Sequence, residues 1–98
     1  MKIIWAPLAV EQLEEIADYI AYDKPLAAKN WVDTIFETIE NLSEFPESGR
    51  MVPELNRNDI REIIKGNYRI IYKVLKYEIH ILTIRHGKRL LDEKVIEA

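Results

Sequence analysis

Arginines spaced along the C-terminal half of the 98-residue chain are the side chains whose type and spacing could do chemistry. A guanidinium stays charged and offers planar, bidentate hydrogen bonds, so a group of them can hold a phosphate and stabilise charge developing on phosphorus. The candidates are Arg61, Arg69, Arg85 and Arg89. Three adjacent strands of a meander would gather them in one patch. The alternative is that they are ordinary sheet-surface arginines paired with Glu62 or Glu78.

Proton transfer at such a patch would need an acid and a base, each contributing about 10²–10⁴-fold to RNA cleavage by the 2′-hydroxyl. Arginine is a poor proton carrier because it remains charged. Only His86 titrates usefully near neutral pH beside the patch. We therefore expect no confident catalytic residue, and under a nuclease alternative the set is Arg61, Arg69, Arg85, His86 and Arg89.

Metal and cofactor chemistry has little support in the composition. The chain has no cysteine, which excludes disulfides, thiol catalysis and cysteine-ligated zinc. The two histidines, His80 and His86, would lie roughly 20 Å apart on one extended strand, too far to share a metal. The three glycines are isolated, so no glycine-rich phosphate loop is present. We expect neither a metal nor a cofactor.

Charge is divided unevenly between the two halves of the chain. Residues 1–56 carry four Lys or Arg and eleven Asp or Glu, a balance of −7, whereas residues 57–98 carry ten and six, a balance of +4. The basic half favours an anionic or acidic partner, and the alternative is that the halves neutralise each other within the fold. The pI of 5.4 argues against a general nucleic-acid binder.

The elements that must position these residues begin with a short strand and a helical hairpin. Residues 2–5 predict a strand, and Pro7 suits the first turn of a helix. Apolar residues at helical spacing continue through residues 13–20 and again through residues 28–42, so we predict two helices, the second ending near Ser43. Asp23 before Pro25 predicts a cap at the start of the second helix. The short join makes the pair an antiparallel hairpin.

The C-terminal half predicts strands. Residues 44–58 hold prolines and glycine and are predicted to be a loop. Residues 60–65, 68–74 and 79–85 then favour three strands, with a tight turn at Gly66-Asn67. A short helix could follow over residues 88–95. The chain is thus predicted to be a single α+β domain over residues 1–98, of β-α-α-β-β-β order, with the hairpin on a small antiparallel sheet.

Localisation follows from what the sequence lacks. No stretch approaches the 18 or so apolar residues that a spanning helix needs, and the N-terminus has no long apolar core of a signal peptide. We expect a cytoplasmic protein with no membrane partner.

Three segments together resemble the RelE/ParE superfamily of toxins from type II toxin–antitoxin pairs. GNYRIIYKV at residues 66–74 resembles its central strand, ILTIRHGKR at residues 81–89 its last strand, and GRMVPEL at residues 49–55 the loop after the helical hairpin. The resemblance covers essentially the whole chain, in the same order. It implies the toxin of a plasmid-stabilisation type system, which forms a hetero-oligomer with a cognate antitoxin.

The resemblance leaves two targets open. The RelE-like branch consists of ribosome-dependent mRNA endonucleases, whereas the ParE-like branch binds DNA gyrase and has no catalytic role. Carried over by position, Arg69 and Arg89 match the two phosphate-contacting arginines of the nuclease branch, and Arg61 matches one basic residue of the preceding strand. The nuclease tyrosine would fall at Val95, so that part of the pattern is missing.

We therefore favour ParE-like inhibition of DNA gyrase by binding, through Arg69, Arg85, Lys88 and Arg89. The alternatives are a ribosome-dependent endonuclease and a non-toxic partner-binding domain of the same fold. The surface that binds the antitoxin is not assigned, and Tyr19, Tyr22, Trp31 and the strand edges are candidates. We also expect Arg69→Ala to leave the fold intact, because the residue lies on a face of the sheet.

Overall fold

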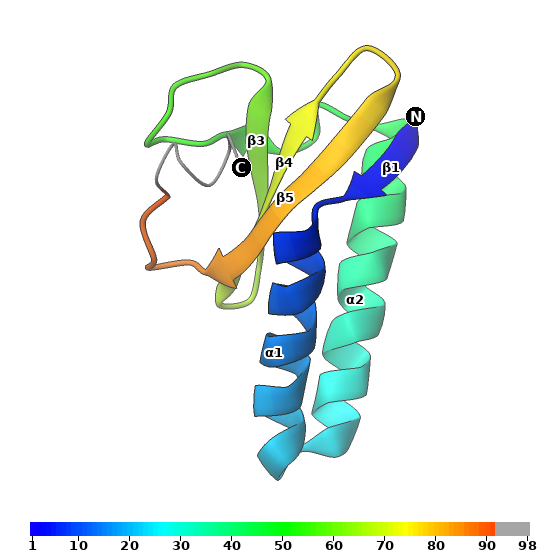
Figure 1. Ribbon diagram of the computed structural model, residues 1–98, viewed down its shortest axis with the longest axis vertical. Helices are drawn as coiled ribbons and strands as arrows, with labels where there is room; N and C mark the ends of the chain where they lie inside the picture. Colours follow the sequence, from blue (N-terminus) through cyan, green and yellow to red (C-terminus); the bar gives the residue numbers. More distant parts are fainter. Residues whose placement is uncertain (92–98) are drawn as a thin grey trace.

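Two helices pack on one face of a five-stranded sheet (Figure 1). The computed structural model describes residues 1–91. The elements in chain order are β1 (Lys2–Trp5), α1 (Pro7–Asp23), α2 (Pro25–Glu44), β2 (Arg50–Met51), β3 (Ile60–Lys65), β4 (Tyr68–Val74) and β5 (Glu78–His86). The predicted α+β class and the helical hairpin on the sheet are confirmed.

The sheet has the strand order β1-β5-β4-β3-β2 and is mixed. The pairs β2–β3, β3–β4 and β4–β5 are antiparallel, as a meander requires. β1 instead pairs parallel to β5, with Ile3 opposite Ile79, so the antiparallel description does not extend to the first strand. Parallel partners need a long crossover, and here the whole chain between them supplies it. β2 was not predicted: it lies inside the segment expected to be a loop.

Both helices begin with proline. Pro7 and Pro25 occupy the first turns, where the missing N–H has no intrahelical partner to lose. One residue, Lys24, separates the helices. The predicted cap at Asp23 is wrong, because Asp23 is the last residue of α1 and Lys24 holds the cap position without a side-chain bond. The sharp restart therefore depends on Pro25.

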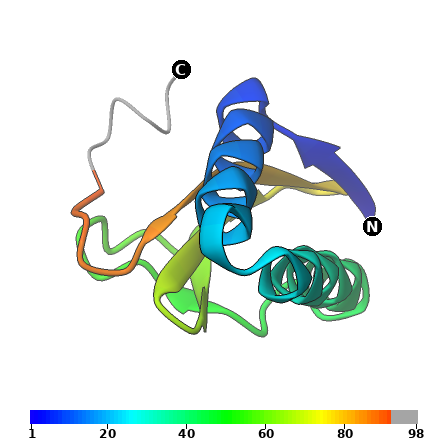
Figure 2. The same ribbon diagram turned by 90° about the horizontal axis from the view of Figure 1, so that it is seen from below.

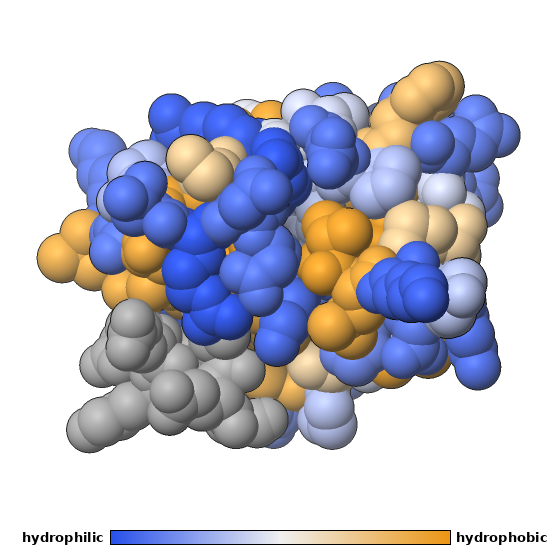
Figure 3. All heavy atoms as spheres, turned by 90° about the horizontal axis from the view of Figure 1, so that it is seen from above, coloured by the Kyte–Doolittle hydropathy of each residue, from blue (hydrophilic) through white to orange (hydrophobic). Residues whose placement is uncertain are grey.

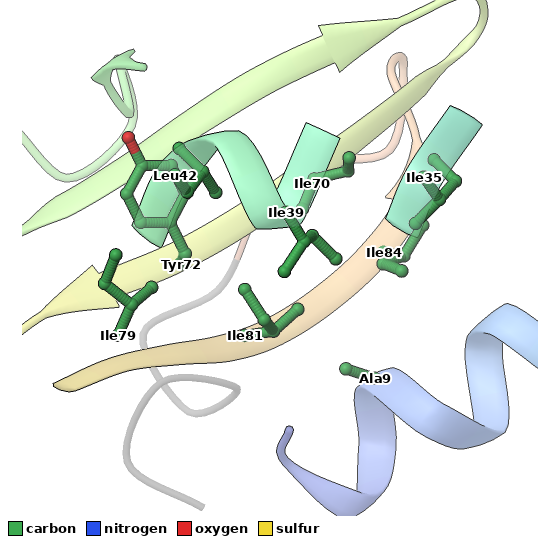
Figure 4. Packing of buried hydrophobic residues seen from close by; sticks show 9 residues of the cluster. All are labelled: Ala9, Ile35, Ile39, Leu42, Ile70, Tyr72, Ile79, Ile81 and Ile84. Carbon is green, nitrogen blue, oxygen red and sulfur yellow. The ribbon is translucent and has the colours of Figure 1, made fainter. Parts of the chain in front are cut away.

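The main core lies between the helices and the sheet (Figure 4). Residues from α2 face β4 and β5, and Ala9 is the fully buried contribution of α1. The other members of this cluster are Ile35, Ile39, Leu42, Ile70, Tyr72, Ile79, Ile81 and Ile84. Phe36, which continues the apolar pattern of α2, is instead 44% exposed and lies against Trp5 at 5.6 Å between ring centroids. Helical periodicity thus located the buried face, although not its outer boundary.

A second, smaller core covers the opposite face of the sheet. It consists of Val52, Ile60, Ile71, Leu82 and Leu91, with Leu55 packed against it. The loop before β3 and the segment after β5 therefore close over the face that the helices leave open. Figure 3 shows that the end of the molecule seen from above is largely hydrophilic, with apolar side chains interrupting it.

Three local predictions for the C-terminal half can now be compared with the fold. The turn at Gly66-Asn67 is confirmed: Lys65 pairs with Tyr68, and Gly66 adopts a φ of 58°, which glycine tolerates without strain. Residues 88–91 are not helical, so the first half of the predicted terminal helix is wrong. Residues 92–95 of that prediction lie outside the described residues. Within residues 1–91, neither helix is long and apolar enough to cross a bilayer.

Candidate functional site

The site is organised around two arginines that face each other across β4 and β5. Arg69 and Arg85 are cross-strand partners, so their side chains project from the same face of the sheet. An irregularity at Ile71/Tyr72 makes this possible, because the register changes from Ile71↔Thr83 to Tyr72↔Ile81. Strict alternation from Ile81 would have placed Arg85 on the helical face. Both arginine residues are buried, at 4% and 6% exposure.

Arg69 is held by two carboxylates. Its Nε and Nη2 donate to Glu62 Oε1 at 2.8 and 2.6 Å. Its Nη1 and Nη2 also donate to the two oxygens of Glu54, at 2.8 and 2.9 Å, in the bidentate geometry that favours arginine. Arg50, which is largely exposed, binds the second oxygen of Glu62 at 2.6 Å. The suggestion that a sheet arginine pairs with Glu62 is therefore confirmed for Arg69.

Glu54 has the most strongly perturbed acidity of the site. Its hydrogen bonds from Arg69 lower the pKa from 4.5 to about 2, although desolvation opposes the shift. The same bonds raise the pKa of the Arg69 guanidinium further above its ordinary value. Both partners are therefore charged at neutral pH, and a ligand phosphate would have to displace Glu54 to reach Arg69.

The network also fixes the chain beyond β5. Arg69 Nη1 donates to the carbonyl oxygen of Arg89 at 3.1 Å, and Arg85 Nη1 donates to that of Leu90 at 3.1 Å. The amide of Leu91 donates to Glu54 Oε2 at 3.0 Å, and its side chain is buried. Successive backbone groups of residues 89–91 are thus tied to the sheet by the two arginines and one carboxylate.

Arg85 differs from Arg69 in having no ion pair within the described part of the chain. Its Nε donates to Thr83 Oγ1 at 3.2 Å, and Thr83 donates to Gln12 Oε1 at 2.6 Å. The same Gln12 oxygen accepts the backbone N–H of Ile84 at 2.9 Å. Gln12 therefore occupies the edge of β5 beyond β1 and orients Arg85 through Thr83.

Burial and neighbouring cations disfavour the charged form of Arg85. Desolvation lowers the pKa of its guanidinium, and repulsion from Arg89 and Arg69 lowers it further. Arginine nevertheless stays protonated at neutral pH. Glu54 offsets these effects in part, so within residues 1–91 the positive charge of Arg85 is only partly compensated.

Arg61 does not join this group. Arg61 pairs with Tyr72 across β3 and β4, so its side chain extends from the same face of the sheet as Tyr72, the face on which the helices pack. Its guanidinium donates to the carbonyl of Gly49 at 2.8 Å and to Asn58 Oδ1 at 2.7 Å. The expectation that all four arginines form one patch is therefore wrong for Arg61, because one strand position separates it from the face of Glu62.

The remaining predicted residues lie at the end of β5 and in the turn that follows it. His86, Lys88 and Arg89 are exposed. His86 lies edge-on to Tyr68 at 6.0 Å between ring centroids, and its Nδ1 accepts the amide of Lys88 at 3.2 Å. His80, on the same strand, instead contacts Glu78 Oε1 at 3.3 Å. Among residues 1–91, no group of three His, Asp or Glu side chains is placed to hold a metal ion.

Sequence reasoning missed Glu54 and Gln12. Glu54 belongs to the loop GRMVPEL that carried part of the family resemblance, but its role depends on a contact fifteen residues away. Gln12 acts over 71 residues, on Thr83. Neither contact leaves a local signature in the sequence.

The aromatic candidates for partner contact lie on the helical hairpin. Tyr19 and Tyr22 are 78% and 90% exposed. Trp31 is partly buried against the core and lies edge-on to Tyr68 at 5.3 Å. Its buried indole N–H has no hydrogen-bond partner within residues 1–91. The hairpin extends beyond the sheet, as Figure 1 shows, so the two tyrosines are free of the core.

Comparisons with known proteins agree on the class of protein. A family model described as ParE toxin of type II toxin-antitoxin system, parDE, matches residues 3–91. The chain is 33% identical over 90 residues to Toxin RelE2 of Caulobacter vibrioides, covering 91% of this chain and 98% of that protein. A solved chain of the chromosomal ParDE TA system from P. aeruginosa has the same fold, with a TM-score of 0.72 and 24% identity over 88% of this chain and 95% of that one. The matched names thus include both RelE and ParE.

Proposed function

The chain belongs to the ParE toxin family of type II toxin–antitoxin systems, and on that premise we propose that it acts by binding DNA gyrase. The contact would be made by the segment after β5, above all by Lys88 and Arg89. A cognate antitoxin neutralises it by covering this surface.

The observation that carries the proposal is the pairing of Arg69 with two carboxylates. Under the nuclease alternative this arginine would contact the reacting phosphate. Its bonds to Glu54 and Glu62 leave it as a positioning residue, which holds the backbone of residue 89. Lys88 and Arg89 are by contrast exposed on an anchored turn, where cations can meet an acidic protein surface.

A ribosome-dependent endonuclease is the second candidate, favoured by the similarity to a protein named RelE2. It would use Arg89 for phosphate contact and His86 as the proton carrier. That mechanism further requires Arg69 to release Glu54. The gyrase proposal requires no such rearrangement.

Two assays with the purified chain separate the candidates. We expect the chain to inhibit DNA supercoiling by gyrase and to leave mRNA uncut in a ribosome-dependent translation reaction. The double variant Lys88→Ala/Arg89→Ala should lose at least about tenfold in inhibition, because the loss of even one hydrogen bond to a charged group typically costs about 1.5 kcal/mol or more. Lys29→Ala, which removes an exposed cation from α2, is the matched control and should inhibit normally.

The opposite result would be ribosome-dependent cleavage of mRNA with no effect on supercoiling. In that case His86→Ala decides the role of the histidine, since loss of cleavage would identify it as the proton carrier. Under the gyrase proposal the same variant inhibits normally. A chain that affects neither gyrase nor translation and leaves growth unchanged would instead be a non-toxic partner-binding domain.

A further inference from the structure

A pocket of about 380 Å³ lies between α1 and the end of β5. Gln12, Ile16 and Tyr19 line it from α1, and Tyr68, Arg85 and Arg89 line it from the strands and the following turn. Figure 2 shows the segment after β5 on the side of α1 that faces away from α2. The second helix therefore does not cover this region.

Arg85 leaves hydrogen-bonding capacity unused at this pocket. A guanidinium has five N–H donors. One bonds to Thr83 and one to the carbonyl of Leu90, which leaves three with no partner among the described residues. Arg85 is 6% exposed, and within residues 1–91 its nitrogens are not among the buried atoms that lack a partner, so the spare donors face the accessible space of the pocket.

The charge balance of the described residues also leaves Arg85 without an ion-pair partner. Within residues 1–91, the ion-paired group of Arg50, Arg69, Glu54 and Glu62 is neutral, and Arg85, the cross-strand neighbour of Arg69, adds one positive charge beside it. Both carboxylates are bound by Arg69, and Glu62 also by Arg50, so neither is bonded to Arg85. Arg89 adds a second cation at the rim of the pocket.

We propose that this pocket binds a carboxylate side chain of the antitoxin, with Arg85 as the buried anchor and Arg89 at the rim. The inference rests on the antitoxin partner of the family and goes beyond the proposed target. A carboxylate fits the planar fork of arginine in a bidentate manner. The Thr83–Gln12 chain of hydrogen bonds holds that fork in place before the ligand arrives.

An acidic peptide suits the surroundings better than the backbone of a nucleic acid. Glu15 lines the same pocket, and α1 also carries Glu11, Glu14 and Asp18. These carboxylates would repel a run of phosphates, whereas a single carboxylate needs to avoid only Glu15. The apolar surfaces of Ile16 and Tyr19 are suited to the neighbouring side chains of a peptide.

This placement also explains how binding would neutralise the toxin. Arg89 is both at the rim of the pocket and in the segment proposed to contact gyrase. An antitoxin segment anchored on Arg85 would cover that segment, so the two partners would compete for one surface.

The test uses overlapping synthetic peptides of the antitoxin encoded beside this toxin, titrated against the purified full chain by calorimetry. In the peptide that binds, changing one Asp or Glu to its amide should weaken binding about 10- to 100-fold. The same peptide change should have little effect on the Arg85→Gln variant, whereas it should keep its full effect on Arg57→Gln, a matched control at an arginine that pairs with Asp59 away from the pocket. Glu15→Gln should tighten binding, because it removes a competing carboxylate.

Peptide changes against the wild-type toxin, together with Glu15→Gln, keep the test valid if Arg85→Gln does not fold. The inference is overturned if no acidic position of any binding peptide matters, or if the acidic position matters equally with and without Arg85. It is also overturned if inorganic phosphate or single-stranded RNA binds in an Arg85-dependent manner while the peptides do not. Gyrase is absent from this experiment, so failure of the proposed target would leave its result unchanged.

Discussion

Replacing Arg69 with methionine tests the claim that the buried arginine–carboxylate network organises the site. The change removes the main partner of Glu62, whose side chain is fully buried, and both bonds to Glu54. Removing one member of a buried ion pair typically costs about 3–5 kcal/mol, since the other charge stays buried without compensation. Arg50 still contacts Glu62, so we expect a loss near the lower end, about 3 kcal/mol. This prediction differs from the sequence-based expectation that Arg69→Ala leaves the fold intact, because Arg69 is buried with two carboxylates.

The expected loss is large for a domain of this size. Natural domains are stable by about 5–15 kcal/mol, and a chain of 60–100 residues loses roughly 4–8 °C of Tm for each kcal/mol. Arg69→Met should therefore lower Tm by about 12–24 °C. Urea unfolding, followed by the fluorescence of Trp5 and Trp31, gives the free energy of unfolding directly.

Two further variants make the measurement decisive. Arg50→Met removes an arginine that is 65% exposed and should cost less than about 1 kcal/mol. Combining Arg69→Met with Glu62→Leu also removes the buried negative charge of Glu62 that the single change leaves without its main partner. The double variant should therefore be less destabilised than the sum of the two single variants by at least about 1 kcal/mol. If Arg69→Met costs no more than Arg50→Met, the network is effectively solvated and the reasoning fails.

Three other changes test the surrounding structure. A Cβ at Gly49 would lie 2.5 Å from the hydroxyl of Tyr72, so Gly49→Ala should destabilise the fold by about 1–3 kcal/mol in urea unfolding. Because the pKa of Glu54 is about 2 in the folded chain against 4.5 unfolded, its stabilisation is present above about pH 5 and is lost as pH falls toward 2. At about 1.4 kcal/mol per pKa unit this is roughly 3 kcal/mol, reduced by solvent screening to about 1–2 kcal/mol, and Glu54→Gln should remove that part of the acid dependence measured by thermal unfolding. Gln12→Ala removes the acceptor of the Thr83 hydroxyl and the Ile84 amide, and should lower the free energy of unfolding by about 1–3 kcal/mol. A smaller loss, with unchanged protection of the Ile84 amide from hydrogen exchange, would count against this role of Gln12.

The helices and the turns were predictable because their causes are local. A period of 3.6 residues in apolar side chains defines the buried face of a helix without reference to its partner. Proline at a first turn and glycine at a positive φ are likewise properties of a few neighbouring residues, as Pro25 and Gly66 illustrate. The same local rules gave a wrong prediction at Asp23, a residue type suited to capping that is instead the last residue of α1.

The site was predicted only in part, because its charges are paired over long distances. Arg69 and Arg85 were recognised as candidates from their type and from the family resemblance. Their different environments were not recognised, since these depend on Glu54 reaching across from a loop and on Gln12 reaching across from α1. A charged side chain in a sequence does not reveal whether its counter-charge is already present in the fold.

The sequence by itself thus determined the family, the helical hairpin, the strands of the meander and the residues available for binding anions. Tertiary structure decided which of these residues share a surface. One irregularity in the pairing of β4 with β5 brings Arg85 to the face of Arg69, while unbroken alternation leaves Arg61 on the other. The physical reason is that side chains alternate between the faces of a strand, so a change of one residue in register reverses the face, and register is fixed only by the packing of the whole sheet.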